Sequence, residues 1–381
     1  MVRLDVNVPL QAKKVLDDSR LVAALPTLRW LLNKGAHLIL VGHLGRPKPG
    51  KITPELSLKP IGYALGRLLR QPVKVLALTQ GTQIIRRAAV SGPVLLENIR
   101  FIKGEEDNSL ELGRKLGELG DIFVNEAFSV CHRAAASLVA ITKYLPSYAG
   151  FYLAEEVRAL EQIRQQGKPP VVAVIGGAKV ADKLPVIAKL VKRCSAVLTG
   201  GEVANTFLFA RRQPIGKSLY DQTELASARR LLKRFAKKII LPSDVIICRT
   251  SLKTKQAQWK QIKEITKQDI IVDIGPNTVG CYAAWLKLAK TIFWGGPLGL
   301  IEEPKWSHGS KSLAWLMHSQ AKGKSYVLAG GGETAAFLHK YKFTLDHIST
   351  AGGALLEFLS GAVLPGLEAL GYNPSLRKLK K

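Results

Sequence analysis

The chain has 381 residues, of which 47% are hydrophobic and 22% charged, a composition typical of a globular protein with room for two domains. This hydrophobic content excludes a chain that is too polar to form a hydrophobic core. Lysine and arginine number 56 against 29 for aspartate and glutamate, so the net charge is +27, which favours anionic partners: phosphorylated metabolites, nucleic acid or an acidic membrane surface.

The excess of basic residues is also explained by general composition, because these residues are spread along the whole chain. Only Lys253–Lys267 and the tail Arg377–Lys381 are locally dense. The cysteines lie far apart and form no CxxC pair, so the sequence predicts neither zinc nor disulfides and favours a reducing, cytoplasmic location. No signal peptide is visible, and no apolar run approaches the roughly 20 residues of a membrane span, so no membrane partner is expected.

The chain begins with a predicted strand and helix that carry polar residues at their junction. Met1–Pro9 alternates like a strand and places Asp5 and Asn7 on one face. The next predicted element is a helix over Arg20–Asn33. Taken alone, the two polar side chains are equally well explained as ordinary strand-end residues.

In the rest of the first half, buried strands are followed by arginine or histidine. The predicted strand Ala36–Gly42 runs into His43 and Arg46. After a helix and a strand near residue 73, the same pattern recurs where the predicted strands Pro93–Leu96 and Asp121–Val124 precede Arg100, His132 and Arg133. Each such residue alone is more often on the surface. Arginines that converge from several strand ends, however, would form a basic, bidentate pocket for phosphate or carboxylate.

A helical pattern over Gly150–Gln166 separates the two halves and is followed by the chain-breaking run Gly167–Pro170. The sequence therefore predicts an N-terminal domain over 1–149, a linking helix over 150–167 and a C-terminal domain over 168–361.

The second half opens with Val171–Val191, which reads as a buried strand, a glycine turn and a helix. Lys179 and Lys183 are four residues apart, which predicts that they share one face in the first turns of that helix. Glycines and a helix N-terminus suit a phosphate chain. The motif is neither GxxxxGK[ST] nor GxGxxG, and two solvated surface lysines are the alternative for the motif alone.

Glycine turns follow the other predicted strands of this half as well. The five segments are VVAVIGGAK, AVLTGGEVANTF, TIFWGGPLGLIEE, YVLAGGGETAAF and HISTAGGALLEF. Such units would place several helix N-termini and bare backbones along one crevice, as a nucleotide needs. Arginines in one half and glycine turns in the other predict two anionic ligands, one bound by each half. Phosphoryl transfer between a nucleotide and a small acidic substrate would use such a pair of sites. This reaction needs positioning and charge neutralisation but no covalent nucleophile.

Ten blocks in order resemble the phosphoglycerate kinase family: RLDVNVP, HLGRP, LLENIRF, VNEAF…HRAAAS, GGAKVADK, DIGPNT, WGGPLG, GGGETAA, ISTAGGA and VLPGLEAL. The match spans essentially the whole chain and is very specific. It implies an α/β fold with two Rossmann-like, doubly wound parallel-sheet domains, joined by a helix and bending about a hinge. The implied activity is reversible phosphoryl transfer between 1,3-bisphosphoglycerate with ADP and 3-phosphoglycerate with ATP, in glycolysis and gluconeogenesis.

The resemblance also assigns residues to the two ligands. It implies that 3-phosphoglycerate is bound by Asp5, Asn7, Arg20, His43, Arg46, Arg100, His132 and Arg133. It implies that the nucleotide is bound by Gly177, Ala178, Lys179, Lys183, Gly201, Pro297, Glu302, Gly331, Gly332, Glu333 and Thr334. Glu302 would lie at the ribose, and Glu333 would hold the Mg²⁺ that is carried with the nucleotide.

Other residues are implied to act on the group in transfer. Arg20 and Lys183 would stabilise its charge, and the helix that starts near Gly352 and Gly353 would point its N-terminus at it. The tail over 362–381 would pack back on the N-terminal domain. A monomer is expected, with 3-phosphoglycerate and ATP or ADP as the partners.

The chain departs from the family pattern mainly on the nucleotide side. Gly295 replaces an asparagine, Glu333 replaces the metal-binding aspartate, and Ala351 and Leu355 stand in a glycine-rich block. Glu202 stands in a glycine run beside the base. A homologue with weakened catalysis is therefore one alternative. A basic nucleic-acid-binding protein is another, but the chain lacks the aromatic residues interleaved with a basic stripe and the motifs expected of it.

Overall fold

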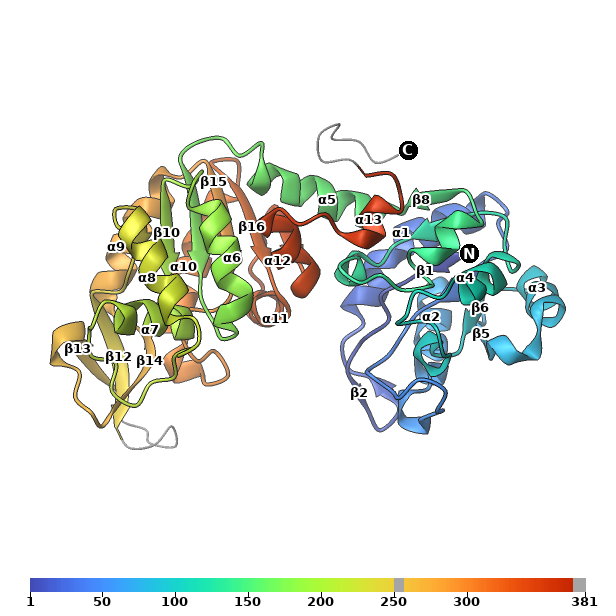
Figure 1. The fold of residues 1–381 in the computed structure, drawn as a ribbon, viewed down its shortest axis with the longest axis horizontal. Coiled ribbons are helices and arrows are strands. Elements are labelled where there is room, and N and C mark those ends of the chain that lie inside the picture. Colours follow the sequence, from blue (N-terminus) through green and yellow to red (C-terminus); the bar gives the residue numbers. More distant parts are fainter. Residues whose placement is uncertain (250–256, 373–381) are drawn as a thin grey trace. The chain divides into compact units, whose positions relative to one another are not determined.

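A computed structural model describes residues 1–249 and 257–372 of the chain (Figure 1). The basic tail Arg377–Lys381 and the first residues of Lys253–Lys267 lie outside this part. The chain divides into two compact units, of which unit 1 comprises Met1–Arg158 with the segment from Val363 onward, and unit 2 comprises Ala159–Ala362.

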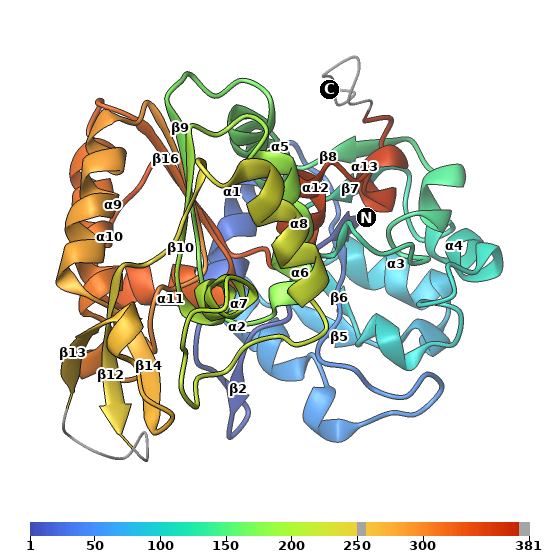
Figure 2. The ribbon, with the colours of Figure 1, turned by 60° about the vertical axis from the view of Figure 1, so that its left-hand side comes forward.

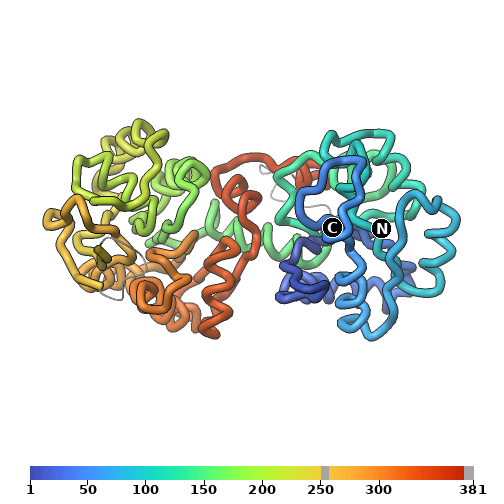
Figure 3. The backbone as a smooth tube through the Cα atoms, turned by 90° about the horizontal axis from the view of Figure 1, so that it is seen from below, coloured from blue at the N-terminus to red at the C-terminus, as the bar shows by residue number. Residues whose placement is uncertain are grey.

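The chain passes between the units twice. The first passage lies within helix α5 (Phe151–Arg164), and the second falls between Ala362 and Val363, where the red part of the tube in Figure 3 leaves unit 2. After the second passage, α13 (Pro365–Glu368) packs on unit 1, where the Gly366 amide donates a hydrogen bond to the Cys131 carbonyl at 2.9 Å.

Unit 1 is built on a six-stranded parallel sheet in the order β5-β6-β4-β1-β7-β8. Its strands are β1 (Val2–Arg3), β4 (Ile39–Val41), β5 (Lys74–Leu76), β6 (Val94–Leu96), β7 (Phe123–Asn125) and β8 (Ser147–Ala149). Its helices are α1 (Ser19–Asn33), α2 (Lys59–Leu69), α3 (Thr82–Val90) and α4 (Leu110–Gly117), and a small hairpin joins β2 (Leu10–Gln11) to β3 (Lys14–Val15). The apolar stripes of α1 and α2 cover one face, where Leu28 and Ile61 pack with Leu40.

Unit 2 has a six-stranded parallel sheet in the order β11-β10-β9-β15-β16-β17. Its strands are β9 (Val171–Ile175), β10 (Ala196–Thr199), β11 (Ile239–Ile240), β15 (Thr291–Gly295), β16 (Tyr326–Gly330) and β17 (His347–Ser349). In chain order this is 3-2-1-4-5-6, the order of dinucleotide-binding folds, in which ligands bind where the order reverses, here between β9 and β15. The central strands are apolar runs because helices cover both faces.

The helices of unit 2 lie on both faces of this sheet, as Figure 2 shows for α9 and α10 on one side and α6 on the other. Their bounds are α6 (Val180–Leu190), α7 (Gly201–Ala210), α8 (Leu225–Phe235), α9 (Pro276–Leu288), α10 (His308–Gln320), α11 (Gly332–Lys340) and α12 (Gly353–Ser360). Successive side chains of β9 point to opposite faces of the sheet and so toward the two helix layers in turn. Val172 and Val174 face one layer, where they pack with Tyr282 of α9 and Met317 of α10.

The doubly wound prediction is confirmed for both units, but unit 2 also contains an antiparallel sheet that the sequence analysis did not predict. Its order is β13-β12-β14, with β12 (Asp244–Arg249), β13 (Gln258–Gln261) and β14 (Asp269–Ile274). Asp244 joins this sheet to α9, because its carboxylate accepts hydrogen bonds from the amides of Asn277 at 3.0 Å and Thr278 at 2.7 Å in the first turn.

Three sequence predictions are wrong in detail. The strand over Met1–Pro9 is reduced to β1, because the Asp5 side chain accepts a hydrogen bond from the Asn7 amide at 3.1 Å and turns the chain. Lys179 precedes α6 in a left-handed conformation (φ +58°), so it does not share a helix face with Lys183. The glycine turn after β15 does not open a helix: Pro297 follows it, and the next α-helix, α10, begins at His308.

Candidate active site

The predicted binding residues of unit 1 gather beyond the carboxyl ends of β1, β4, β6 and β7. One Nη of Arg20, in the first turn of α1, lies 2.9 Å from the carboxylate of Asp5 and 3.1 Å from the Asn7 carbonyl oxygen. The side-chain oxygen of Asn7 accepts the Gly45 amide at 3.0 Å, and the Ser129 hydroxyl donates to Asp5. Asp5, Asn7 and Arg20, which the resemblance assigns to one ligand, are therefore in contact with one another.

His43 lies below this cluster and is only 3% exposed. Its Nδ1 is 3.1 Å from a guanidinium nitrogen of Arg3. Burial and the surrounding arginines, first among them Arg3, lower the pKa of His43 to about 2. The imidazole is therefore neutral at physiological pH, and it positions Arg3 and does not add positive charge.

Arg100 and Arg133 supply fixed cations next to it. Arg100 donates to the Gly45 carbonyl at 2.6 Å, with its Nε 3.3 Å from Glu106, and Nε of Arg133 is 3.3 Å from the His132 ring. A cavity of about 410 Å³ is lined by these two arginines together with Arg3, Glu105, Glu106, Val130, Ala134, Ala135 and Leu138.

Arg46 stands apart because its side chain is exposed and forms no ion pair within the described residues. It follows Gly45, whose amide and carbonyl are held by Asn7 and Arg100. A fixed backbone with an available guanidinium is suited to binding a carboxylate or phosphate. Unit 1 therefore presents a basic surface in which Asp5 holds Arg20 and Glu106 holds Arg100.

In unit 2 the predicted residues lie where the strand order reverses. A side chain on Gly176 would lie 2.1 Å from the Pro297 carbonyl oxygen, and one on Gly201 would lie 2.7 Å from the Gly177 amide nitrogen. Gly177 itself has φ +73°. Only glycine permits these close approaches, so the turns after β9, β10 and β15 form one continuous backbone surface.

Lys183 is the cation at the centre of this surface. It is 9% exposed, and its ammonium donates to the carbonyls of Gly176 and Ala178, the latter at 2.6 Å. Burial lowers the pKa of Lys183 to about 8, although the negative charge of Glu333 partly opposes this shift. Lys179 is more exposed, and no hydrogen bond or ion pair fixes its side chain among the described residues.

A pocket of about 200 Å³ opens beside these turns. Its lining contains six of the predicted nucleotide residues, namely Gly177, Ala178, Gly201, Pro297, Glu302 and Glu333. The remaining wall is made of Glu202, Asn205, Leu219, Ile270, Ile271, Val272, Asp273, Leu298, Gly299 and Leu300. The walls are largely apolar, which suits a planar base, and the glycine turns and Lys183 adjoin one side.

The remaining predicted site residues of unit 2 lie at the N-termini of α11 and α12. Gly331 (φ +105°) and Gly332 begin α11, and a side chain on Gly332 or Gly352 would meet nothing within 4 Å. Thr334 is buried instead, and its hydroxyl accepts the Gly296 amide at 3.1 Å, so it supports the turn from behind. Gly353 is the first residue of α12. The open backbone at both helix starts is of the kind that binds phosphate oxygens.

Sequence analysis missed several residues that shape these sites. Arg3 is 2% exposed and bonds to Ser137 at 2.9 Å as well as to His43. Its position two residues before Asp5 was a signal that it shares the polar face. Asn205 and Leu219 of the unit 2 pocket gave no signal, because their contact, a 2.9 Å hydrogen bond from the Asn205 amide to the Leu219 carbonyl, joins segments 14 residues apart.

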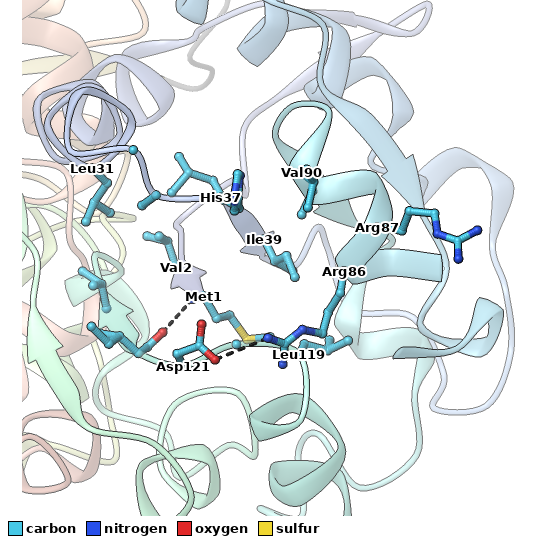
Figure 4. A pocket seen from close by; sticks show the side chains of 17 residues that line it. Met1, Val2, Leu31, His37, Ile39, Arg86, Arg87, Val90, Leu119 and Asp121 are labelled. Carbon is cyan, nitrogen blue, oxygen red and sulfur yellow. Dashed lines mark hydrogen bonds and ion pairs between the residues drawn. The ribbon is translucent and has the colours of Figure 1, made fainter. Parts of the chain in front are cut away.

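A third pocket, of about 500 Å³, lies at the opposite, amino-terminal edge of the unit 1 sheet (Figure 4). Met1, His37, Arg86 and Asp121 are among its lining residues, and the terminal amine donates to the Ile122 carbonyl at 2.6 Å. It contains none of the predicted site residues. Ligands of open α/β sheets bind at the carboxyl ends of the strands, so this pocket is not the active-site candidate.

Within residues 1–249 and 257–372, no cluster of three or more acidic, histidine or cysteine side chains is arranged to hold a metal ion by itself. In the same residues no helix combines the length and the apolar character needed to cross a bilayer. Glu333 is exposed, and one carboxylate from the protein fits a Mg²⁺ that takes most of its ligands from nucleotide phosphates and water.

Comparison with known proteins identifies the relatives of this arrangement. The family model described as phosphoglycerate kinase matches residues 1–362. The phosphoglycerate kinase of Thermomicrobium roseum is 42% identical over 378 residues, with 97% of this chain and 95% of that protein covered. The phosphoglycerate kinase of Herpetosiphon aurantiacus is 40% identical over 379 residues, with the same coverage of both chains.

Solved structures show the same similarity. The structure of phosphoglycerate kinase from Coxiella burnetii superimposes with a TM-score of 0.86 at 38% identity, and the alignment covers 97% of this chain and 95% of that one. The phosphoglycerate kinase from Pyrococcus horikoshii OT3 gives a TM-score of 0.84 at 30% identity, with equal coverage.

Proposed function

The chain belongs to the phosphoglycerate kinase family, and we propose that it divides the family's reaction between its two units. The enzyme is a glycolytic kinase that transfers a phosphoryl group reversibly between 1,3-bisphosphoglycerate with ADP and 3-phosphoglycerate with ATP. The single observation that supports the division is the segregation of charge donors: arginines end the strands of unit 1, whereas glycine turns and Lys183 end those of unit 2.

In this proposal unit 1 binds 3-phosphoglycerate. Asp5 accepts a hydrogen bond from its hydroxyl, the side-chain NH₂ of Asn7 donates to its carboxylate end, and the arginines neutralise its phosphate. The surrounding hydrogen bonds hold Arg20 and Arg100 in place before the substrate arrives, so little side-chain entropy is lost on binding. His132 and the neutral His43 position the neighbouring guanidiniums and carry no positive charge of their own toward the substrate.

Unit 2 binds the nucleotide. The base enters the pocket beside Pro297, the ribose lies at Glu302, and the phosphates follow the glycine turns toward Lys179 and Lys183. The amides of Gly332, Gly352 and Gly353 face the phosphates from the starts of α11 and α12, whereas the Gly331 amide donates to the Ser349 carbonyl at 3.2 Å and holds the turn before α11. Glu333 holds the Mg²⁺, which supplies charge neutralisation between the phosphates.

Arg46 gives the sharpest test of this division. Arg46→Ala is expected to raise KM for 3-phosphoglycerate by about ten- to a hundredfold, the value of one or two charge-assisted hydrogen bonds, with KM for ATP unchanged. Steady-state kinetics with each substrate varied in turn measures both constants. Arg87→Ala, an exposed arginine on α3, is the matched control. A variant in which both KM values rise together, or neither does, would refute the placement of the substrate on unit 1.

Because the two ligands bind different units, we propose that transfer requires closure of the units about α5. The radius of gyration from small-angle scattering is expected to fall when 3-phosphoglycerate and a non-hydrolysable MgATP analogue are both present, and to change less with either alone. An unchanged radius with both ligands bound, in a preparation that turns over normally, would contradict closure.

We also propose that the enzyme acts as a cytoplasmic monomer. The four cysteines are free thiols, three of them buried, as expected of a reducing compartment. Light scattering during gel filtration would reveal a dimer if one forms. Nothing in the described residues favours nucleic-acid binding as the function.

A further inference from the structure

The base pocket of unit 2 contains acidic side chains but no basic one. Its lining includes the carboxylates of Glu202, Asp273, Glu302 and Glu333, and no lysine, arginine or histidine. Asp273 is buried at 1% exposure and is committed to the Ile274 and Gly309 amides at 2.9 and 2.8 Å. It is therefore not available to a ligand.

Glu202 lines the pocket together with apolar residues such as Leu219 and Leu300. Glu202 is the second residue of α7, whose first residue, Gly201, is fixed by a 3.0 Å hydrogen bond from its amide to the Leu298 carbonyl. Leu219 lines the same pocket with 76% of its surface exposed, an apolar area that a bound base would cover. Glu202 is thus held where a base inserts.

The Glu202 carboxylate is free to bind that base. It forms no hydrogen bond or ion pair within the described part of the chain, although its charge is among those that act on the Lys183 ammonium. Its main-chain carbonyl accepts a hydrogen bond from the Thr206 hydroxyl at 2.9 Å. A carboxylate only accepts hydrogen bonds, and its two oxygens match two adjacent donors. The Watson–Crick edge of guanine offers two adjacent donors, N1–H and N2–H, whereas adenine places its N6 amino donor beside the acceptor N1.

We propose that Glu202 is a specificity-determining residue that shifts the nucleotide preference of this enzyme toward guanine. The inference rests on the proposed nucleotide site and adds the base to it. A bidentate side-chain pair discriminates between bases by about tenfold or more. We therefore expect kcat/KM for GTP, divided by kcat/KM for ATP, to be about tenfold higher in this enzyme than in a variant without the carboxylate.

Two substitutions test the proposal, with kcat/KM for MgGTP and MgATP measured at saturating 3-phosphoglycerate. Glu202→Gly removes the carboxylate and is expected to lower the GTP-to-ATP ratio about tenfold. Glu202→Gln keeps the shape but offers one donor and one acceptor, the pattern that pairs with adenine, and is expected to lower the ratio further. A ratio that stays within twofold of the wild-type value in both variants would overturn the proposal.

Two neighbouring glutamates separate base recognition from general charge effects. Glu303→Gln removes an exposed charge outside the pocket lining and is expected to leave the ratio unchanged. Glu302→Gln alters the proposed ribose contact and is expected to lower both kcat/KM values equally, because ATP and GTP share the ribose. A Glu303→Gln ratio that falls as far as the Glu202→Gln ratio would assign the effect to charge and overturn the proposal.

Calorimetric titration with MgADP and MgGDP measures binding without turnover. It therefore tests the role of Glu202 separately from the proposed function. The wild-type preference for GDP over ADP, relative to Glu202→Gly, is expected to match the kinetic ratio. If neither ATP nor GTP supports transfer to 3-phosphoglycerate, the proposed function fails. The ratio of the dissociation constants for GDP and ADP still decides the role of Glu202 in that case. Equal ratios in the wild type and both variants would overturn that role.

Discussion

Replacing Lys183 by alanine is expected to lower kcat by about a hundred- to a thousandfold while the protein stays folded. The ammonium is held by the Gly176 and Ala178 carbonyls in a buried position beside the glycine turns. A fixed, desolvated cation stabilises the charge that develops on a transferring phosphoryl group far better than a solvated one, and removing one such donor costs this much in comparable sites.

Single-turnover or steady-state kinetics, with circular dichroism to confirm folding, measures the loss. Lys183→Met keeps the apolar stem and serves if the alanine variant is unstable, and Lys189→Ala on the exposed side of the same helix is the matched control. If kcat of the alanine and methionine variants equals that of the wild type, Lys183 has no part in the mechanism.

The pH dependence of kcat/KM tests whether the positive charge of Lys183 is what accelerates the reaction. Burial lowers the pKa of Lys183 to about 8, so the ammonium loses its proton as the pH rises through this value. In the wild type kcat/KM for the nucleotide, which reports the free enzyme, is expected to fall above pH 8. This alkaline limb is expected to be absent from the Lys183→Met variant. The same limb in both proteins would assign it to another group.

Replacing Arg20 by alanine is expected to lower kcat/KM for 3-phosphoglycerate by about a hundredfold or more. Arg20 contacts Asp5 and the Asn7 carbonyl, and its side chain remains 26% exposed toward the ligand side. The substitution removes the guanidinium and also leaves Asp5 without its cation, so an uncompensated negative charge repels the substrate.

Arg20→Lys is expected to recover only part of the activity, because an ammonium keeps the charge but not the planar fork that binds two oxygens at once. Arg29→Ala, on an exposed position of the same helix, controls for effects on α1 and is expected to leave the kinetics unchanged. An Arg20→Ala variant with wild-type kcat/KM would exclude Arg20 from the substrate site.

Much of this arrangement is predictable because it depends on local patterns. The apolar run of β9 and the glycines after it predict a buried strand and a turn from backbone physics alone, and the structure places that strand at Val171–Ile175. The arginines after β4, β6 and β7 are predictable as a cluster, since the carboxyl ends of parallel strands meet at one edge.

Other features depend on contacts between distant residues and leave no local signal. His43 is neutral because burial, and after it the positive charge of Arg3 from 40 positions earlier, lowers its pKa. Lys179 lies outside α6 because its backbone takes a left-handed conformation at φ +58°, which a helix cannot contain. The antiparallel sheet around β12 was missed because its strands interrupt the parallel repeat that the sequence pattern follows.

The central claim is that this chain transfers a phosphoryl group between a nucleotide on unit 2 and 3-phosphoglycerate on unit 1. The most direct test is a coupled assay of the purified full-length protein with 3-phosphoglycerate and ATP, run without metal, with Mg²⁺ and with Mn²⁺. We expect metal-dependent turnover that Lys183→Ala and Arg20→Ala both suppress, with the Mg²⁺-to-Mn²⁺ ratio reporting the geometry at Glu333. No turnover with any nucleotide and metal, in a protein that still binds 3-phosphoglycerate, would contradict it.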